Sequence, residues 1–164
     1  MKIYGVAGWK NSGKTGLMER LVAEIRSRGL RVSTVKHAHH SFDLDQPGKD
    51  SYRHRAAGAG EVLLTSARRW ALMHELDEGE EEPPLGALLG KLAPCDLVLV
   101  EGFKREAHPK VEASRKETGQ GLIAREDATI RAVACDYAVA LERPVFDLND
   151  TRAIADFILE EVGL

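Results

Sequence analysis

The chain has 164 residues, of which 43% are hydrophobic and 30% are charged, the composition of a globular protein rather than a disordered one. Its net charge of −3, from 23 Lys and Arg against 26 Asp and Glu, argues against a broad nucleic-acid-binding surface. We expect a single domain over residues 1–164 of a cytoplasmic protein without a leader or membrane span, in which Cys95 and Cys135 stay reduced.

Strand-like and helix-like patterns alternate along the chain. Apolar or β-branched runs predict strands at residues 3–7, 31–36, 61–66, 69–75, 96–102, 110–114, 130–134 and 144–148. Helical spacing and capping signals predict helices at residues 14–29, 50–59 and 85–92, and a closing helix after residue 150. This alternation predicts a three-layer α/β fold, with a mostly parallel sheet between helix layers and a β-hairpin at 61–75.

Residues 8–15 form a complete phosphate-binding loop, or P-loop, of the pattern G-x-x-x-x-G-K-[ST], between a predicted strand and a predicted helix. Gly8 and Gly13 permit the tight turns that point backbone N–H groups at the β- and γ-phosphates. Lys14 places a positive charge there, Thr15 can ligate Mg²⁺, and the helix N-terminus attracts the same anion. The predicted nucleotide site consists of these residues and the rest of the loop, Lys10, Asn11 and Ser12. The alternative is an ordinary strand-to-helix turn with a solvated lysine.

A second nucleotide-binding element ends the most apolar predicted strand. Ligands of parallel sheets lie beyond the carboxyl ends of the strands, which is where Glu101 stands. We expect Glu101 to act with Thr15 on Mg²⁺, directly or through water, and Gly102 to let the backbone approach the γ-phosphate. The alternative is that Glu101 only caps the loop after the strand.

A polar segment at residues 36–52 reads KHAHHSFDLDQPGKDSY. With the phosphate loop and the later segments 69–72, 100–104, 109–112 and 147–150, it resembles the molybdopterin-guanine dinucleotide biosynthesis protein B family along nearly the whole chain. The resemblance implies a dimeric P-loop protein that binds GTP and Mg²⁺ and hydrolyses GTP weakly. It also implies a role in molybdenum-cofactor synthesis, in assisting the guanylyltransferase that joins molybdopterin to GMP.

The family pattern extends to single positions. Gly8, Gly13, Lys14 and Thr15 match its phosphate loop, and Glu101-Gly102 match its second nucleotide motif. Some related P-loop ATPases carry a lysine directly after the first glycine, which contacts a partner subunit. Here Trp9 takes that position and the lysine follows as Lys10, so the sequence does not support that role.

The polar segment allows several kinds of chemistry. Its candidates for binding a second ligand are His37, His39, His40 and Lys49. Asp43 or Asp45 could orient the attacking water if this loop opens toward the γ-phosphate. The three histidines could instead bind a metal ion such as Zn²⁺ or Ni²⁺, or hold, with the lysine, the phosphate or molybdate end of a pterin. The remaining alternative is a solvated loop.

The sequence gives little indication of how a guanine base would be recognised, since it contains no N-K-x-D motif. Asn149 and Asp150 follow the last predicted strand, and a carboxylate there can accept hydrogen bonds from guanine. The alternative is that Asp150 only caps the last helix.

A short basic segment follows Glu101 and carries Lys104, Arg105, Lys110, Arg115 and Lys116. Such a run is usually a solvated face. Its place beside the nucleotide makes Lys104 and Lys110 further candidates for binding a phosphate-bearing second ligand.

The leading interpretation is a GTP-binding accessory protein with a protein or pterin partner. The alternative is a small-molecule kinase or ATPase, which the acidic segment 78–82 disfavours as a lid over phosphates. The strand 69–73 would be open to aggregation if left bare, so we expect a second copy of the chain to pair with it.

Overall fold

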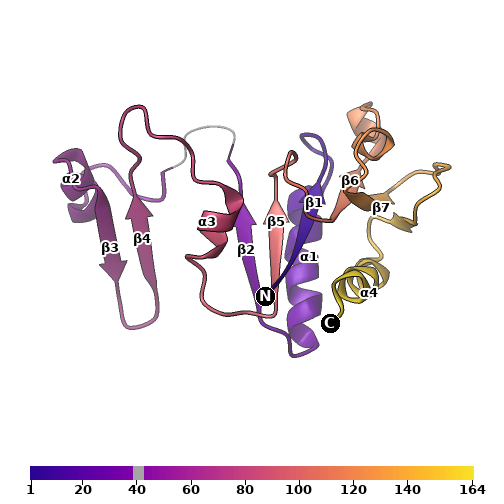
Figure 1. Ribbon diagram of the computed structural model, residues 1–164, viewed down its shortest axis with the longest axis horizontal. Helices are drawn as coiled ribbons and strands as arrows, with labels where there is room; N and C mark the ends of the chain where they lie inside the picture. The colour runs from indigo at the N-terminus through magenta and orange to yellow at the C-terminus, as the bar shows by residue number, and fades with distance from the viewer. Residues whose placement is uncertain (39–42) are drawn as a thin grey trace. The chain divides into compact units, whose positions relative to one another are not determined.

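The computed structural model describes residues 1–38 and 43–164, and the chain divides into two compact units. The larger unit comprises residues 1–37 and 85–164, and the smaller one comprises residues 38–84. Each unit has its own β-sheet (Figure 1). Among the helices described, none has both the length and the apolar character that crossing a membrane requires. The single domain expected over residues 1–164 stays a prediction.

The larger unit is built on a six-stranded sheet whose neighbouring strands run parallel, in the order β2-β5-β1-β6-β7-β8. Its strands are β1 (Lys2–Ala7), β2 (Val32–Lys36), β5 (Leu97–Glu101), β6 (Lys110–Ser114), β7 (Ile130–Cys135) and β8 (Val145–Asp147). Its α-helices are α1 (Lys14–Ser27), α3 (Leu85–Leu89) and α4 (Thr151–Val162). The predicted α/β fold with a parallel sheet is thus confirmed.

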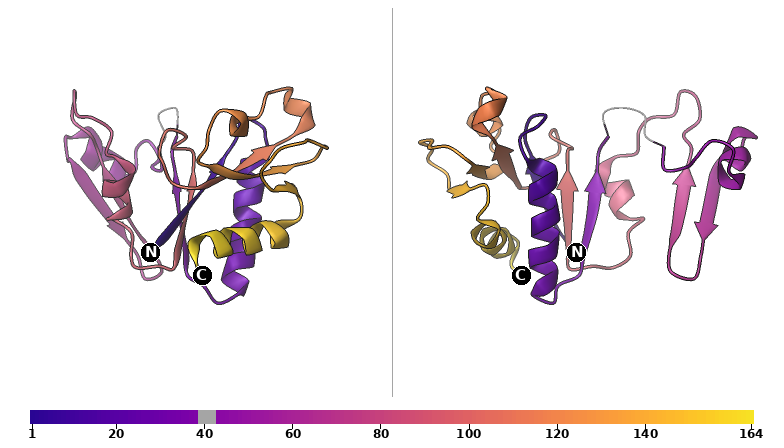
Figure 2. Two further views of the ribbon diagram at one scale, coloured as in Figure 1. Left: turned by 45° about the vertical axis from the view of Figure 1, so that its right-hand side comes forward. Right: turned by 180° about the vertical axis from the view of Figure 1, so that it is seen from behind.

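Helices cover this sheet in two layers (Figure 2). On one face, α1 and α4 pack together over the alternate side chains of the central strands. On the other face, α3 packs against Val98 and Val100, and a second apolar cluster gathers around Val133. Because β5 is buried on both faces, it reads as an uninterrupted apolar run in the sequence.

The smaller unit combines α2 (Asp50–Ala56) with an antiparallel pair, β3 (Glu61–Thr65) and β4 (Trp70–His74). The predicted β-hairpin is therefore confirmed. Val62 is buried, whereas the other face of the pair exposes Leu63, Trp70 and Leu72. Alternate residues of a strand point to opposite faces, so Val62 lies on one face of the hairpin and the three exposed side chains lie on the other, bare face.

Several boundaries differ from the predicted ones. The helix expected over residues 50–59 ends at Ala56, because the chain then turns at Gly58, whose φ is 99°. The helix expected over residues 85–92 ends at Leu89. Two 3₁₀ turns, Lys116–Thr118 and Ile123–Arg125, were not predicted, because three residues are too few to show a periodic pattern.

Candidate functional site

The phosphate loop joins β1 to α1 and depends on two glycines. A Cβ atom on Gly8 would lie 2.4 Å from the carbonyl oxygen of Ala113, so only glycine fits there. Gly13 has a φ of 90° and forms the N-cap of α1. Between them Asn11 also adopts the left-handed conformation, with a φ of 63°. The backbone therefore has the tight, left-handed turns that the motif predicts.

Polar groups of the loop face a cavity of about 360 Å³, which is lined by Asn11, Ser12, Gly13, Lys14, Thr15, Gly16, Arg115 and Glu117. The Ser12 side chain is buried, and its hydroxyl has no hydrogen-bond partner among the described residues. Lys14 donates from Nζ to the carbonyl oxygen of Trp9 at 2.6 Å, and burial lowers the pKa of its ammonium group. A buried hydroxyl without a partner and a partly desolvated cation suit an anionic ligand.

The predicted pair of metal-binding residues lies together at the carboxyl ends of β1 and β5. Thr15 Oγ1 is 3.5 Å from Glu101 Oε1, although 86 residues separate the two in sequence. Parallel pairing of the strands, which places Val6 opposite Glu101, explains this approach. Lys36, at the end of β2, reaches the same carboxylate oxygen at 3.6 Å. A hydroxyl and a carboxylate are oxygen ligands of the kind that Mg²⁺ takes, so these residues fit the predicted ion.

The turn after β5 is strained beside this pair. Gly102 and Phe103 have φ values of 94° and 46°, and a Cβ on Gly102 would lie 2.9 Å from Cβ of His37. The Phe103 ring packs on the His37 ring with their centroids 4.9 Å apart. The next residue, Lys104, places its ammonium group 4.5 Å from the ring centroid of Trp9. Lys104 therefore lies beside the phosphate loop, and its contact with a second ligand stays a prediction.

Trp9, which replaces the lysine of related ATPases, ties the phosphate loop to a later segment. Its indole Nε1 donates to the carbonyl oxygen of Gly121 at 2.7 Å. With Lys10 and Asn11 it lines a second cavity of about 730 Å³, whose other walls are Glu117, Thr118 and Gln120. The sequence showed Trp9 in place of the lysine of related P-loop ATPases, but it did not indicate that Trp9 links the loop to Gly121.

Asn149 and Asp150 lie after β8, and the structure shows a capping role for Asp150. Its carboxylate accepts a hydrogen bond from the backbone N–H of Ala153 at 3.1 Å, at the start of α4. Arg20 of α1 ties this turn to the phosphate-loop helix by donating to the Leu148 carbonyl at 2.7 Å. The Leu148 side chain also lies 3.1 Å from where a Cβ on Gly13 would stand. The turn is thus next to the phosphate loop, and its contact with a base stays a prediction.

Lys110 requires a correction, because it is fully buried and is not part of a solvated basic face. Its ammonium group donates to the carbonyl oxygens of Glu106 and His108 and to Thr129 Oγ1. Every donor direction of a buried ammonium group must find such a partner. Lys110 therefore has a structural role, in which it joins the turn before β6 to Thr129, and its ammonium group is not available to a second ligand.

Glu112 is a buried carboxylate that the sequence did not indicate. It accepts hydrogen bonds from the backbone N–H groups of Ile123 at 2.9 Å and Ala124 at 2.8 Å. Burial raises the pKa of its carboxyl group, and the two N–H groups oppose that shift. Its function is to hold the 3₁₀ turn that begins at Ile123.

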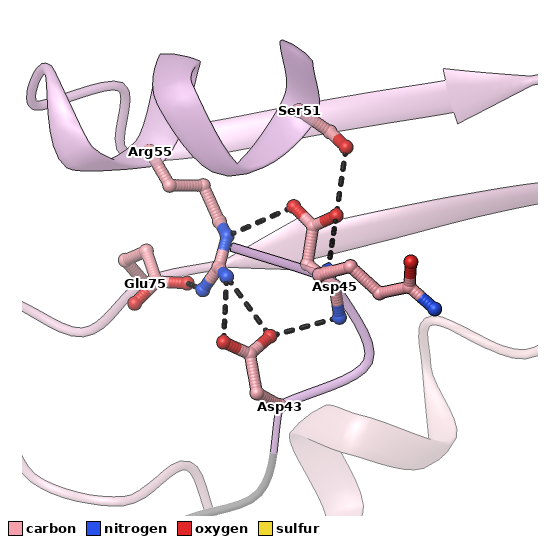
Figure 3. Close-up of polar contacts among 6 residues, drawn as sticks. Asp43, Asp45, Ser51, Arg55 and Glu75 are labelled. Atoms are coloured by element: carbon pink, nitrogen blue, oxygen red, sulfur yellow. Dashed lines mark hydrogen bonds and ion pairs between the residues drawn. The ribbon is translucent and has the colours of Figure 1, made fainter. Parts of the chain in front are cut away.

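In the smaller unit, Asp43 and Asp45 surround Arg55 of α2 (Figure 3). Arg55 Nη2 donates to both carboxylate oxygens of Asp43, at 2.9 and 3.0 Å, and Nη1 donates to Glu75 at 2.7 Å. Asp45 accepts from the Ser51 hydroxyl at 2.9 Å and lies 3.6 Å from Arg55 Nε. The backbone N–H of Asp45, and then Arg55, hold the pKa of Asp43 below its ordinary value. The two aspartates thus have a structural partner that the sequence did not predict.

The proposed histidine site is described only in part. His37 follows β2 and packs on Phe103, whereas His39 and His40 lie outside the described residues. Lys49 is exposed at the start of α2. Over residues 1–38 and 43–164, no three His, Cys, Asp or Glu side chains are grouped as metal ligands.

The comparisons with known proteins agree on one family. The family model of molybdopterin guanine dinucleotide synthesis protein B matches residues 3–136. A molybdopterin-guanine dinucleotide biosynthesis adapter protein of Escherichia coli is 40% identical over 163 residues, covering 96% of this chain and 91% of that protein. A protein of the same description in Haemophilus influenzae is 40% identical over 156 residues, covering 95% of this chain and 86% of that protein.

Solved structures share the whole fold. A MobB protein homolog from Bacillus stearothermophilus is 33% identical and aligns with a TM-score of 0.73 over 99% of both chains. The structure of Bacillus subtilis MobB is 27% identical and aligns with a TM-score of 0.76 over 99% of this chain and 98% of that one.

Proposed function

Because this chain belongs to the molybdopterin guanine dinucleotide synthesis protein B family, we propose that it is an adapter protein in the synthesis of the molybdenum cofactor. The relatives from E. coli and H. influenzae carry that description and match nearly the whole chain. The adapter would bind GTP with Mg²⁺ and assist the guanylyltransferase that attaches GMP to molybdopterin. Molybdopterin itself is a second candidate ligand.

The observation that carries the nucleotide proposal is the approach of Thr15 to Glu101 beside the phosphate loop. The loop backbone and Lys14 would hold the phosphates, and Thr15 and Glu101 would hold the Mg²⁺ ion. The ion would neutralise charge on the phosphates when it is bound. Lys36 would then compete with the ion for Glu101, because its ammonium group lies 3.6 Å from the same carboxylate.

The guanine preference rests on the turn after β8. Asn149 and Asp150 would contact the base, and Arg20 and Leu148 support that placement by tying the turn to α1 and Gly13. One carboxylate oxygen of Asp150 already caps α4, which leaves the other to accept from guanine.

Hydrolysis of GTP would be slow. The residues proposed to orient the attacking water, Asp43 and Asp45, both form ion pairs with Arg55. The backbone N–H of Asp45 and the guanidinium group of Arg55 hold the pKa of Asp43 below its ordinary value, so this carboxylate accepts a proton from water poorly. The role of this site would therefore be nucleotide binding rather than rapid turnover.

The proposal is tested by calorimetric titration of GTP and ATP, each with Mg²⁺, into the wild type, Lys14→Ala and Lys91→Ala. We expect GTP to bind the wild type and Lys91→Ala far more tightly than ATP does, and Lys14→Ala to lose the binding. Lys91 is the control because it is an exposed lysine that lines neither of the two cavities beside the phosphate loop. Equal affinity for both nucleotides would contradict the guanine assignment and favour a small-molecule kinase or ATPase. A wild type that binds neither would overturn the nucleotide site.

A further inference from the structure

Arg115 directly follows β6, the strand next to β1, and its backbone is held firmly. Its carbonyl oxygen accepts from both the backbone N–H and the hydroxyl of Thr118, at 3.1 and 2.8 Å. The next backbone N–H, of Lys116, donates to Asp136 at the end of β7 at 2.8 Å. The preceding residue, Ser114, is buried and hydrogen-bonded to Tyr137. The fold therefore fixes the position from which this side chain extends.

The guanidinium group of Arg115 lies against the phosphate loop. Its Nε is 3.0 Å from the position that a Cβ atom on Gly13 would take, and its Cζ is 3.6 Å from it. Gly13 is the N-cap of α1, so the guanidinium group lies at the helix end where an anion is attracted. Arg115 also lines the cavity that Ser12, Lys14 and Thr15 face.

Among the residues that the structure describes, the guanidinium group of Arg115 has only one ionic partner, and that interaction is weak. Arg115 Nη1 lies 3.4 Å from Glu117, and both side chains are largely exposed, at 42% and 68%. Ion pairs of this kind contribute little, so a stronger anion can displace the carboxylate. Arginine presents a planar set of donors that matches a phosphate group.

We propose that Arg115 binds the phosphates of the nucleotide as the second cation of the site. This inference rests on the proposed nucleotide function. Lys14 reaches the start of the loop at Trp9, whereas Arg115 lies at its end beside Gly13. A phosphate chain in the cavity would thus lie between two cations. Glu117 lines the same cavity, and its negative charge would repel the phosphates.

The test is calorimetry of GTP and of inorganic tripolyphosphate, with Mg²⁺, on the wild type and on variants of this turn. We expect Arg115→Ala to lower the affinity for both ligands by roughly tenfold or more, and Arg115→Lys to recover part of that affinity. Glu117→Gln should bind both ligands more tightly, because it removes the competing carboxylate. Lys116→Ala is the matched control, since it removes an adjacent, exposed positive charge that does not line the cavity.

Each outcome decides the question. If Arg115→Ala and Lys116→Ala both bind GTP with the affinity of the wild type, the inference is overturned. A loss for GTP with unchanged tripolyphosphate binding would also overturn it, because the guanidinium group would then contact the nucleoside. If Lys14→Ala abolishes binding and Arg115→Ala does not change it, the inference alone fails. If the wild type binds neither titrant, the proposed function fails as well.

Discussion

His108 is a residue that burial makes sensitive to pH. Its Nε2 atom is buried, has no hydrogen-bond partner among the described residues, and packs on the backbone of β1 at Gly5. Burial, and then the positive charge of Lys110, lower the pKa of His108 to about 4, against an ordinary value of 6.5. Asp127 opposes this shift. The folded protein therefore holds His108 neutral.

The sign of the resulting effect follows from proton linkage. Between pH 6.5 and about 4 the unfolded chain protonates His108 and the folded chain does not, so stability falls as the pH falls through this window. At about 1.4 kcal/mol for each pKa unit, the loss from this partly buried group is at most about 3.5 kcal/mol. Denaturant unfolding of the wild type and His108→Gln across this range measures it. If the free energy of unfolding of His108→Gln falls with pH as steeply as that of the wild type, His108 is not the group responsible.

The motif residues of the site could be predicted from sequence because their chemistry is local. Gly8, Gly13, Lys14 and Thr15 stand within eight positions of one another, in a pattern that one ligand requires. Lys110 and Glu112 could not be predicted in this way. The Thr129 hydroxyl that binds Lys110 and the backbone N–H groups that bind Glu112 come from later segments, so the sequence around the two residues shows only charged residues in a strand.

At the scale of elements, α2 depends on Arg55. The guanidinium group joins the loop before the helix, through Asp43 and Asp45, to the residue after β4, Glu75. Among the described residues of the smaller unit, Val62 is the buried apolar side chain, so the ion pairs of Arg55 are among the contacts that hold α2 to the loop before it and to the end of β4. Loss of the guanidinium group would leave two aspartates facing each other without a cation.

We therefore expect Arg55→Ala to loosen the smaller unit without unfolding the larger one. Amide hydrogen exchange followed by mass spectrometry should become faster over residues 43–56 and 70–75 and stay unchanged in β1 and β5. Arg53→Ala is the control, since Arg53 is exposed on the same helix. Equal exchange in Arg55→Ala and the control would show that the cluster does not stabilise the unit.

The elements were predictable to different degrees. The strands β1, β5 and β7 are long apolar runs and lie close to where the sequence predicts them. The helices α2 and α3 are shorter than predicted, because their ends depend on local turns such as the one at Gly58. The cluster around Arg55 joins residues up to 32 positions apart, from Asp43 to Glu75, and no periodic pattern indicates it.

At the scale of the whole molecule, alternation of strands and helices predicted parallel pairing but not the strand order. The order β2-β5-β1-β6-β7-β8 places β1 between two strands that follow it by about a hundred residues. Pairing at that distance depends on contacts that the local pattern does not contain. The same order brings Glu101, Thr15 and Arg115 around one loop.

The bare face of the hairpin supports a homodimer. Leu63 and Leu72 stand opposite each other, and with Trp70 they are 62%, 44% and 68% exposed. We expect a second copy of the chain to cover this face, because a two-stranded sheet also leaves both edges unpaired.

Sedimentation velocity at micromolar concentration tests this expectation. The wild type should sediment as a dimer, and Leu72→Lys should shift the protein toward the monomer because it places a charge in the apolar face. Arg68→Ala, in the turn between the two strands, should sediment as the wild type does. A monomeric wild type would contradict the proposed dimer.

The most direct measurement is the rate at which a molybdopterin guanylyltransferase forms molybdopterin guanine dinucleotide from GTP and molybdopterin. It is measured without this protein, with the wild type, and with Lys14→Ala, at equal protein concentrations. We expect the wild type to raise the rate and Lys14→Ala not to raise it, because the proposed adapter would act through its nucleotide site. If Lys14→Ala raises the rate as much as the wild type does, the phosphate loop has no part in assisting the enzyme, and the proposed function is wrong.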